Sequence, residues 1–530
     1  MSRRPVRRVS CAPPLHNSSN LRLSASRFLL PMLSSTRNRA LFASTVLVGL
    51  IARVVVGIHS VAIAHSDEHQ QYLEVAQKLA FHGPAIEFWE QSRGVRNLIY
   101  PYFLALVLRL DDVVGIHAPL AQAASIRVLL GTVGFLLFAR LAWRYLQQRR
   151  PVVGLAALVL FGLLPPVVYF QARCLSENAI IIPLIGALLL MPRRPFWAGI
   201  CLGLMFAVRF QSAFISAGII CVAILDDRII QRGRGDAPLE GKAWLQLPSL
   251  RLAAGTLLAL CLSVGLFDRL TLGGWFHSPV EYLTANVLEN RAAKFGVSPW
   301  YQYFIWLGED LWRGTLLVSI LLVPGIRRQW RLFVPVAFMI LGHSAVGHKE
   351  QRFIWSIAPL LALITAEGFA AVWHGLSRVG AQVGWARGLF TVVALACLVL
   401  GGLRTYKDIE WKGGYYYYGS ALSLDYLRQQ DDVRGVLCLG VPRYRSGNYF
   451  FLRKPIPLLY AQNRISRSAS RKVNYVLSTK RAVRDWKEQL SRTTHRQVQG
   501  PVAKFGNVAI YRLVPKARRK GKHESRHKQQ

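Results

Sequence analysis

The chain has 530 residues, 52% of them hydrophobic, and its 66 Lys and Arg outnumber its 27 Asp and Glu, which leaves a net charge of +39. Charged residues make up only 18% of the chain, against about 25% in average soluble domains. This composition excludes a disordered chain and argues against an ordinary cytosolic enzyme. The 7 cysteines form no CxxC pair and no zinc spacing, so we expect neither a disulfide framework nor a structural metal.

The first forty residues predict a basic cytosolic tail. They hold only arginines as charged residues, and the first apolar run begins after them. A secretory signal peptide would place its apolar core near the start and follow it with a small-residue cleavage site, and neither feature is present. The positive-inside rule therefore places the N-terminus in the cytosol.

Apolar blocks long enough to cross a bilayer follow, since a span takes roughly 20 helical residues. Several blocks are shorter than that and need Tyr, Trp and Arg from the membrane interface at their ends. We expect roughly ten to twelve transmembrane helices. The blocks are 41–64, 98–110, 126–146, 152–170, 179–191, 196–225, 252–271, 316–323, 332–346, 353–372 and 389–400.

Basic loops give the expected orientation. If the segments 226–251, 327–331 and 378–387 are cytosolic, alternation puts the loops 65–97, 273–312 and 347–352 outside, and the final helix exports everything after Arg404. One misfit remains, because this count leaves Arg149, Arg150, Arg193 and Arg194 outside. A helix count that is wrong by one between residues 98 and 225 would explain it.

The outer loops hold the unusual clusters of the chain. The loop 65–97 contains a large share of the few acids, and Asp67 and Glu68 lie next to the membrane, where ionisable groups tend to mark a site. The alternative is that these acids only end the first helix and face water. The loop 286–304 is rich in aromatics, which an aromatic belt at the headgroup level would also explain. The stretch 348–353 could bind a lipid phosphate or be a solvated charged loop.

After Arg404 we expect a separate small α/β domain over 404–515, followed by a basic disordered tail at 516–530. Short β-branched runs at 436–440, 473–477 and 508–513 predict strands, and 421–429 predicts a helix. The region is strongly basic but lacks groove-reading or stacking motifs, so we expect no nucleic-acid role. Anionic membrane lipids or an anionic acceptor are the expected partners.

The order of these motifs resembles glycosyltransferase family 22, the mannosyltransferases that build N-glycan precursors and GPI anchors. The sequence HSDEHQQYLE at 65–74 is similar to that family's H-x-D-E-x-x-Q-Y-x-E element. The Trp-Glu pair of the family is similar to WE at 89–90, and its R-[SN]-x-x-x-P element is similar to RNLIYP at 96–101. Its aromatic loop resembles FGVSPWYQY at 295–303. Its H-K-E-x-R-F signature resembles HKEQRF at 348–353, and its R-x-x-S-[NE] element resembles RCLSE at 173–177. The resemblance covers about 41–403, and Ser298 departs from it where a His is expected.

The resemblance implies a polytopic α-helical membrane protein of GT-C type with a small C-terminal α/β domain, whose catalytic part is 41–403. It implies transfer of a hexose, most of all mannose, from a polyprenyl-phosphate-sugar donor to a hydroxyl of a glycan or glycolipid acceptor at the external membrane face. An acceptor hydroxyl needs a base, and one carboxylate suffices for a displacement with inversion. We assign this role to Asp67, with Glu68 as the orienting or substitute group.

The departing lipid phosphate needs fixed cations. We assign Lys349 and Arg352 to it, with His348 and Arg96 beside them. Trp89 and Trp300 are expected to stack on sugar faces unless they anchor the protein in the membrane. The remaining expected substrate contacts are Gln71, Glu90 and Tyr303. No metal or other cofactor is expected, because the ligands in 65–69 lie too close together on one helical turn to converge.

Two alternatives stay open. A membrane transporter or lipid flippase would have the same hydropathy, but it predicts internal repeats and broken helices with polar residues at the midplane. A membrane scaffold with a basic tail would leave the acidic loop and the HKEQRF stretch unexplained. We expect a bacterial member in the inner (plasma) membrane, or an endoplasmic reticulum membrane if the source is eukaryotic.

Overall fold

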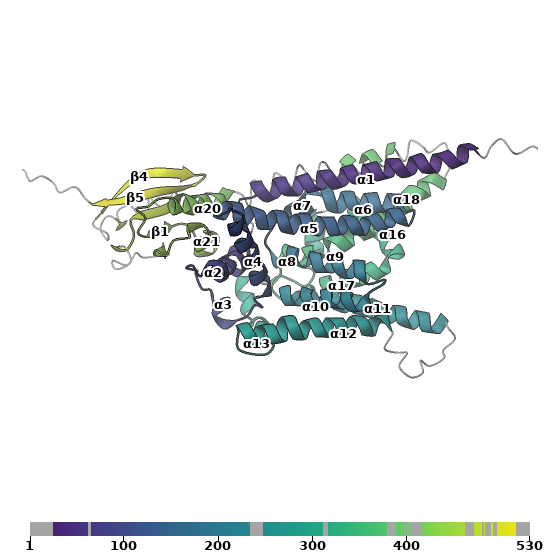
Figure 1. The fold of residues 1–530 in the computed structure, drawn as a ribbon, viewed down its shortest axis with the longest axis horizontal. Coiled ribbons are helices and arrows are strands. Elements are labelled where there is room, and N and C mark those ends of the chain that lie inside the picture. Colours follow the sequence, from purple (N-terminus) through teal and green to yellow (C-terminus); the bar gives the residue numbers. More distant parts are fainter. Residues whose placement is uncertain are drawn as a thin grey trace, which may run out of the picture.

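The computed structural model describes residues 25–61, 65–233, 247–310, 316–378, 415–461, 471–479 and 496–515, with scattered positions between 388 and 403 and at 482, 489 and 490. A long helical bundle carries a small sheet at one end (Figure 1). The first 24 residues of the predicted tail 1–40, the predicted tail 516–530, most of the block 389–400 and the middle of the loop 226–251 lie outside the described residues. The rest of the predicted N-terminal tail, from Ala25 on, is helical and continues into the first apolar block.

Five helical stretches of the described residues are long and apolar enough to cross a membrane. They belong to α1 (Ala25–His59), α5 (Pro119–Gln147), η2 (Phe210–Ser212) with α11 (Ala213–Gly233), α12 (Pro248–Leu260) with η4 (Cys261–Leu266) and α13 (Phe267–Thr271), and η8 (Gln351–Ile357) with α18 (Ala358–Arg378). The bent pair α6 (Pro151–Leu163) and α7 (Pro165–Gln171) adds a sixth.

Among the described residues, five or six of the ten to twelve predicted helices are long enough to span a membrane by themselves. Several of the other apolar blocks form shorter helices of 10–17 residues. These are α8 (Ser176–Ala179) with α9 (Ile181–Leu190), α10 (Pro195–Val208) and α17 (Trp330–Ser344), and α16 (Leu316–Arg328) is similarly short.

The block 98–110 was predicted to span the membrane, and this is where the orientation estimate went wrong. It forms α4 (Ile99–Val113), which lies across the end of the bundle instead of along it (Figure 1). Because α4 does not cross the membrane, the chain crosses it once less before residue 149, and Arg149 and Arg150 lie at the same end of the bundle as the other basic turns. Contacts confirm this: Arg150 pairs with Glu367, Gln329 also binds Glu367, and Arg331 pairs with Asp226.

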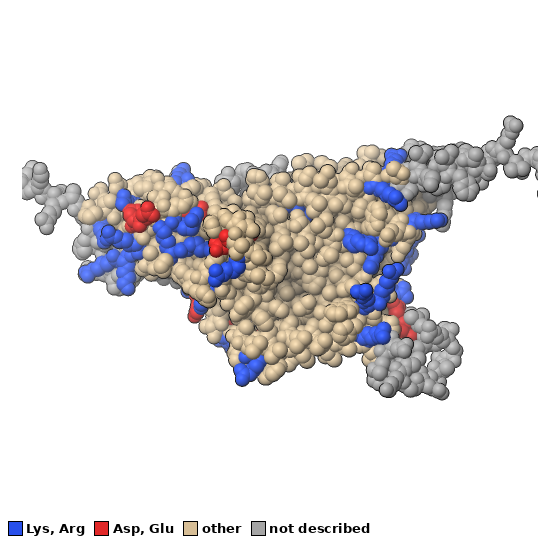
Figure 2. All heavy atoms as spheres, viewed as in Figure 1, with Lys and Arg blue, Asp and Glu red and all other residues tan. Residues whose placement is uncertain are grey.

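Basic side chains gather at the end of the bundle that faces away from the sheet (Figure 2). Arg193 and Arg194 follow α9 in this region, because Arg144 at the end of α5 binds the carbonyl of Leu189. The positive-inside rule assigns this end to the cytosol. By the same rule the opposite end, which carries the sheet, is predicted to be external, and we call it the external end.

Short helices connect the bundle to the sheet at the external end (Figure 1). η1 (Glu68–Leu73) and α2 (Glu74–Phe81) follow one another as one helical rod, and α3 (Trp89–Arg93) comes after them. The remaining external pieces are α14 (His277–Leu283), η5 (Thr284–Leu288), η6 (Arg291–Phe295) and α15 (Gln302–Asp310).

The C-terminal sheet has the strand order β2-β1-β3-β5-β4. The strands are β1 (Val436–Leu439), β2 (Leu458–Ala461), β3 (Tyr475–Thr479), β4 (Arg496–Phe505) and β5 (Val508–Pro515). β1 pairs in parallel with β2 and β3, and β5 is antiparallel to β3 and β4. The three predicted strands and the predicted helix, α20 (Tyr415–Arg428), are present. Two strands were missed. β2 has only four residues, and the mostly exposed, polar residues of β4 carry no strand pattern.

The C-terminal region has one hydrophobic core of its own and shares another with the membrane part. One hydrophobic core runs from η1, α2 and α4 into α20, the sheet and α21 (Asn448–Leu452). Leu73 and Ala76 on the helical rod lie in the same core as Phe450 and Phe451 of α21. The external loop and the C-terminal domain therefore support each other.

A buried arginine stabilises the bend between α6 and α7, which amounts to 63°. Pro165 and Pro166 lack N–H groups, so the carbonyls four residues before them, of Phe161 and Gly162, have no helical donor. Arg53 of α1, which is fully buried, donates to both carbonyls at 2.9 Å. Its Nε also donates to Gln171 Oε1 at 2.8 Å, so it fixes the chain that leaves α7.

Glycines let two helix pairs approach closely. An added Cβ at Gly199 of α10 would lie 2.0 Å from the Leu252 carbonyl oxygen of α12, and one at Gly255 of α12 would lie 2.0 Å from the Phe196 oxygen of α10. α16 and α18 meet in the same way at Gly325 and Gly368. Small residues at helix contacts are typical of membrane bundles, where close packing replaces the hydrophobic driving force.

The role of Arg53 predicts a stability effect. Arg53→Met would leave two backbone carbonyls and the Gln171 amide oxygen without their donor, and each buried unsatisfied group costs about 1–3 kcal/mol. We expect a clear fall in the unfolding midpoint of the purified protein in detergent. The matched control is Arg140→Met on the exposed side of α5, which should leave the midpoint nearly unchanged. An equal fall in both variants would contradict this account.

Candidate active site

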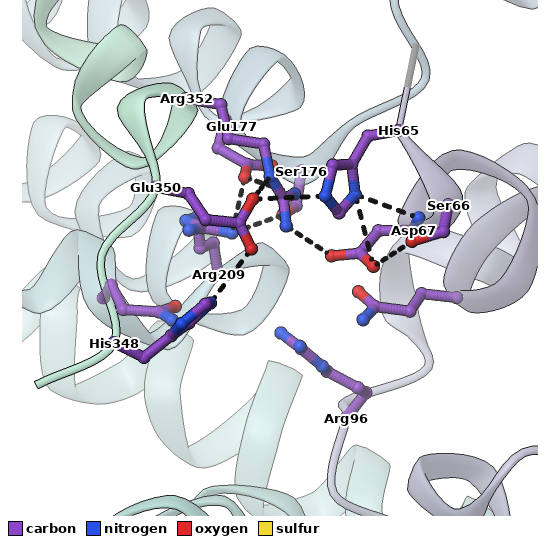
Figure 3. Close-up of polar contacts among 12 residues, drawn as sticks. His65, Ser66, Asp67, Arg96, Ser176, Glu177, Arg209, His348, Glu350 and Arg352 are labelled. Carbon is purple, nitrogen blue, oxygen red and sulfur yellow. Dashed lines mark hydrogen bonds and ion pairs between the residues drawn. The ribbon is translucent and has the colours of Figure 1, made fainter. Parts of the chain in front are cut away.

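Three carboxylates from three separate segments surround one arginine at the external end. Arg352 donates from Nη2 to Asp67 at 2.7 Å, from Nη1 to Glu177 at 2.8 Å and from Nε to Glu350 at 2.6 Å (Figure 3). Asp67 directly precedes η1 and makes no capping hydrogen bond with its side chain, Glu177 lies in α8, and Glu350 precedes η8. Because each guanidinium edge serves a different segment, Arg352 fixes the first external loop to the 348–353 stretch.

The imidazole of His65 lies between two of these carboxylates (Figure 3). Its Nδ1 is 3.4 Å from Asp67 Oδ1, and its Nε2 is 3.1 Å from Glu350 Oε2. Burial alone would lower the pKa of His65, but hydrogen bonds to Asp67 and Glu350 outweigh it and raise the pKa to about 9. A pKa of about 9 favours the protonated ring at neutral pH, whereas the Asp67 N–H, whose nitrogen lies 3.2 Å from Nδ1, favours the neutral ring.

Asp67 is held in its ionised form. Burial would raise its pKa, but the charge of Arg352, the hydrogen bond with His65 and the charge of Arg96 together hold the pKa well below its usual range. The pKa of Glu350 is likewise lowered, because His348, His65 and Arg352 outweigh its burial. The Asp67 side chain keeps 17% of its surface exposed, so the carboxylate is charged and open on one side.

Arg209 extends the charge network behind Arg352. It follows α10, is buried, and contacts Glu177 at 3.2 Å and Ser176 Oγ at 3.1 Å through Nη1. Glu177 is thus shared by two guanidinium groups, of Arg209 and Arg352. Such sharing satisfies a buried carboxylate that would be costly on its own.

The 348–353 stretch and the aromatic loop are joined by hydrogen bonds. His348 contacts the Gly296 carbonyl through Nδ1 at 2.9 Å and Glu350 through Nε2 at 3.0 Å. The pKa of His348 is raised, mainly by Glu350. Lys349 Nζ donates to the carbonyls of Ser298, at 3.1 Å, and Val346. In this arrangement Lys349 holds the loop, and its ammonium group does not join the carboxylates around Arg352.

A second polar group lies beside Asp67. Gln71 Nε2 donates to Glu90 Oε2 at 2.8 Å, and Arg96 Nη2 donates to Glu90 Oε1 at 3.2 Å. Arg96 also lies over the Tyr282 ring, 5.5 Å from its centre. Figure 3 shows Arg96 pointing toward the region between His348 and Asp67. Trp89, at the start of α3, lies under Arg291 at 5.0 Å.

Two predicted residues lie elsewhere. Glu68 is buried and accepts a hydrogen bond from the Cys174 N–H at 3.0 Å and lies 3.8 Å from Arg173. Its carboxylate therefore supports the 173–177 segment instead of orienting Asp67. Tyr303 has no exposed surface and packs against Trp306 and His343. The structure thus offers no Tyr303 face to a sugar, whereas Trp300 is 65% exposed.

Sequence reasoning left out four residues of the cluster: His65, Glu177, Arg209 and Glu350. Three of them stand inside motifs that had been singled out, at HSDE, RCLSE and HKEQRF. Proximity to those motifs was the available signal. Arg209 lies in no such motif, and only its position in the fold links it to Glu177.

An apolar cavity of about 570 Å³ opens between α6, α16, α17 and α18. Its lining includes Gln351, the residue before Arg352, together with Phe304, Ile354 and Trp355. The cavity is almost entirely apolar, and its lining residue Gln351 is the sequence neighbour of Arg352. Among the residues that the structure describes, no three His, Cys, Asp or Glu side chains are placed to hold a metal ion.

Comparison with known proteins gives a family match. The model of the Alg9-like mannosyltransferase family matches residues 44–453, more than three quarters of the chain. The mannosyltransferase APTG1 of Arabidopsis thaliana is 22% identical over 61% of this chain and 57% of its own length. The GPI alpha-1,2-mannosyltransferase 3 of Xenopus laevis is 28% identical over 57% of this chain and 56% of its own length. The chain thus spans little more than half the length of these relatives.

A solved structure shows the fold. ArnT from Cupriavidus metallidurans, in its structure bound to undecaprenyl phosphate, superposes with a TM-score of 0.54 at 12% identity. The match covers 92% of this chain and 98% of that one. It confirms the predicted fold class, a polytopic helical GT-C type protein with a small C-terminal α/β domain.

The state of His65 predicts a pH dependence. Its folded pKa of about 9 lies above the unfolded value of 6.5, so its ion pairs stabilise the fold fully below about pH 6.5 and lose this effect as the pH rises through about 9. His65→Asn should lower stability at pH 6 by about 1–2 kcal/mol after solvent screening. Unfolding midpoints of both proteins should converge above pH 9. A difference that stays constant with pH would contradict this prediction.

Arg352 predicts a larger effect. Arg352→Gln leaves three carboxylates without their shared cation, and loss of one partner of a buried ion pair costs about 3–5 kcal/mol. Chemical unfolding of the purified protein in detergent measures this loss. The control is Arg331→Gln, which breaks the exposed pair with Asp226 and should cost less than about 1 kcal/mol. Similar losses in the two variants would show that Arg352 does not hold the cluster.

Proposed function

The chain belongs to the Alg9-like mannosyltransferase family, and we propose that it transfers mannose from a polyprenyl-phosphate donor to a hydroxyl group of a glycan or glycolipid at the external membrane face. The observation that carries the proposal is the position of Asp67. It is ionised, partly exposed and in contact with cationic side chains at the external end of the bundle. The family and the named relatives are mannosyltransferases. The transporter or flippase alternative finds no support in them.

Asp67 is the proposed base. Its carboxylate is ionised, partly exposed and positioned by Arg352 and His65. A carboxylate with a low pKa is a weak base. The pKa of Asp67 would rise, and the base would become stronger, if the Arg352 guanidinium bound another anion and stabilised the Asp67 carboxylate less. The phosphate of the donor is such an anion. Binding of the donor would then raise the basicity of Asp67 at the moment that the acceptor hydroxyl must lose its proton.

The cations of the site are proposed to stabilise the leaving phosphate. Its negative charge grows as the bond to the sugar breaks, and fixed cations then stabilise the transition state. Arg352 and His348 lie on the segment next to Asp67, and Arg96 points toward the same region from the other side. Lys349 contributes by holding the loop 296–298 against this segment. The reaction therefore needs no metal ion or other cofactor in this proposal.

The apolar cavity supports a lipid-linked donor. A polyprenyl chain needs an apolar surface that continues from the membrane to the phosphate site. The cavity between α6, α16, α17 and α18 has that character and includes Gln351, next to Arg352. The related fold of ArnT holds undecaprenyl phosphate in its solved structure. We propose that the donor lipid of this chain lies in the cavity.

Sugar contacts are proposed for Gln71, Trp89, Glu90 and Trp300. The Gln71–Glu90–Arg96 group offers hydrogen-bonding atoms beside Asp67. Trp300 presents an exposed ring on the aromatic loop. With a single carboxylate as base, the transfer proceeds by one displacement, with inversion at the anomeric carbon. The Xenopus relative is named for GPI, which suggests a glycolipid acceptor.

The chain is an integral multi-pass membrane protein. We propose the bacterial inner membrane as its location, with the endoplasmic reticulum membrane as the alternative. Anionic lipid headgroups are the proposed partners of the basic C-terminal domain, whose Lys and Arg are prominent in Figure 2. Nucleic acid is not a proposed partner.

Replacing Asp67 tests the proposal. Asp67→Asn keeps the size of the side chain but removes the base, and a positioned base contributes about 10²–10⁴-fold to a rate. We expect transfer from radiolabelled polyprenyl-phosphate-mannose to fall by at least about 100-fold in membranes that contain the variant.

The matched control is Glu87→Gln, an exposed carboxylate of the same loop that pairs with Lys78. It should retain wild-type transfer. Transfer by Asp67→Asn at more than about a tenth of the wild-type rate would remove Asp67 from the role of base. A wild-type protein that binds no lipid-linked sugar would refute the proposed function itself.

A further inference from the structure

The helical rod that begins at Asp67 is held midway by a buried carboxylate. η1 (Glu68–Leu73) and α2 (Glu74–Phe81) form the rod, and Asp67 is its N-cap. Glu74, at the junction of the two helices, has no exposed surface. Because the rod is continuous, any constraint on Glu74 is transmitted to the position of Asp67.

Glu74 binds two other parts of the chain. Its Oε1 accepts from the Ile86 N–H at 3.0 Å and from the Tyr449 N–H at 3.3 Å, and its Oε2 accepts from the Phe450 N–H at 2.9 Å. Ile86 lies in the same external loop, whereas Tyr449 and Phe450 belong to α21 of the C-terminal domain. One side chain therefore joins the rod, the rest of the loop and the C-terminal domain.

The charge of Glu74 makes this arrangement expensive for a purely structural contact. All three of its hydrogen-bond donors are backbone N–H groups. Burial raises its pKa to about 7 against the effect of these donors and of the nearby Arg453 charge. A neutral apolar residue would avoid the cost of a buried charge, but it would leave these three N–H groups without an acceptor. The carboxylate is distinguished by its ability to bind N–H donors on both sides of the loop–domain contact.

Neighbouring contacts reinforce the same connection. The His69 ring, one turn before Glu74 on the rod, lies 5.2 Å from the ring of Phe451 in α21. Arg443 of the C-terminal domain donates to the Glu87 carbonyl at 2.8 Å. Arg453, at the end of α21, donates to Gln122 of α5 at 2.7 Å, so α21 is itself fixed to the membrane bundle.

We propose that Glu74 is a positioning residue, which holds Asp67 in its place through the contact with α21, and that the C-terminal domain thereby acts as the support of the catalytic base. The inference rests on the proposed function, because it assigns Asp67 the role of base. Its structural part, the coupling of α21 to the start of the rod, does not depend on the reaction.

The test uses the full chain purified in detergent. Glu74→Gln keeps the shape but replaces one acceptor oxygen by an amide group, which cannot accept an N–H donor. Hydrogen exchange of peptides covering 65–70 and 448–451 is measured together with kcat and KM for the radiolabelled donor. We expect faster exchange in both peptides, a fall in kcat of about tenfold or more and a donor KM that changes less than about twofold, because the donor cations are untouched.

Two further variants complete the design. Glu74→Asp keeps both acceptor oxygens on a shorter side chain and should recover part of the kcat that Glu74→Gln loses. If Glu74→Gln does not fold, Glu74→Asp is compared with the wild type instead, and faster exchange in both peptides with a smaller fall in kcat is expected. Glu87→Gln, on the same loop, should leave both exchange and kcat unchanged. Faster exchange at 448–451 alone, with kcat preserved, would overturn the proposal. If the wild type transfers no sugar, the proposed function fails, and the exchange at 65–70 still decides whether Glu74 couples the two parts.

Discussion

The three-way sharing of Arg352 is the interaction on which the external end of the molecule depends. Asp67, Glu177 and Glu350 come from segments that lie far apart in the sequence, and each contributes a carboxylate to the same guanidinium group. Three carboxylates at this distance would repel one another without that cation. The planar guanidinium, with donors in fixed directions, is the side chain that can satisfy all three. A lysine at this position would offer a point charge without this geometry.

The segments that meet at Arg352 are positioned by other constraints of the fold. Pro165 and Pro166 break the helix before the Glu177 segment, and Arg53 compensates for the hydrogen bonds that they remove. In a lipid environment such compensation is required, because unsatisfied backbone groups find no water. Arg53 then also binds Gln171, where the chain turns toward Glu177. The buried Arg53 thus helps to position the segment that carries Glu177, although it does not contact the site itself.

The external loop and the C-terminal domain form one body. Their shared hydrophobic core and the contacts of Glu74 with α21 bind them together. The family match, which ends at residue 453, extends to the end of α21. Together these observations indicate that the first part of the C-terminal domain belongs with the membrane bundle as a structural unit. The charge network around Arg352 and the tether at Glu74 act on opposite ends of the same short helical segment.

The sequence by itself determined the class of the protein and the motifs of the site. Long apolar blocks and asymmetric basic loops can be read locally, because a bilayer imposes a length and a charge rule on each segment. The three motifs that contain Asp67, Glu177 and Glu350 were likewise visible as short patterns. Only the tertiary structure decided which of their side chains meet.

Glu68 is adjacent to Asp67 but points to Cys174, and Tyr303 is buried. Arg209 enters the site with no local signal. The block 98–110 has the composition of a span but lies across the bundle end, because its position depends on packing against α2 and α5. Direction of side chains and contacts between distant segments are properties of the packed chain, and no local pattern contains them.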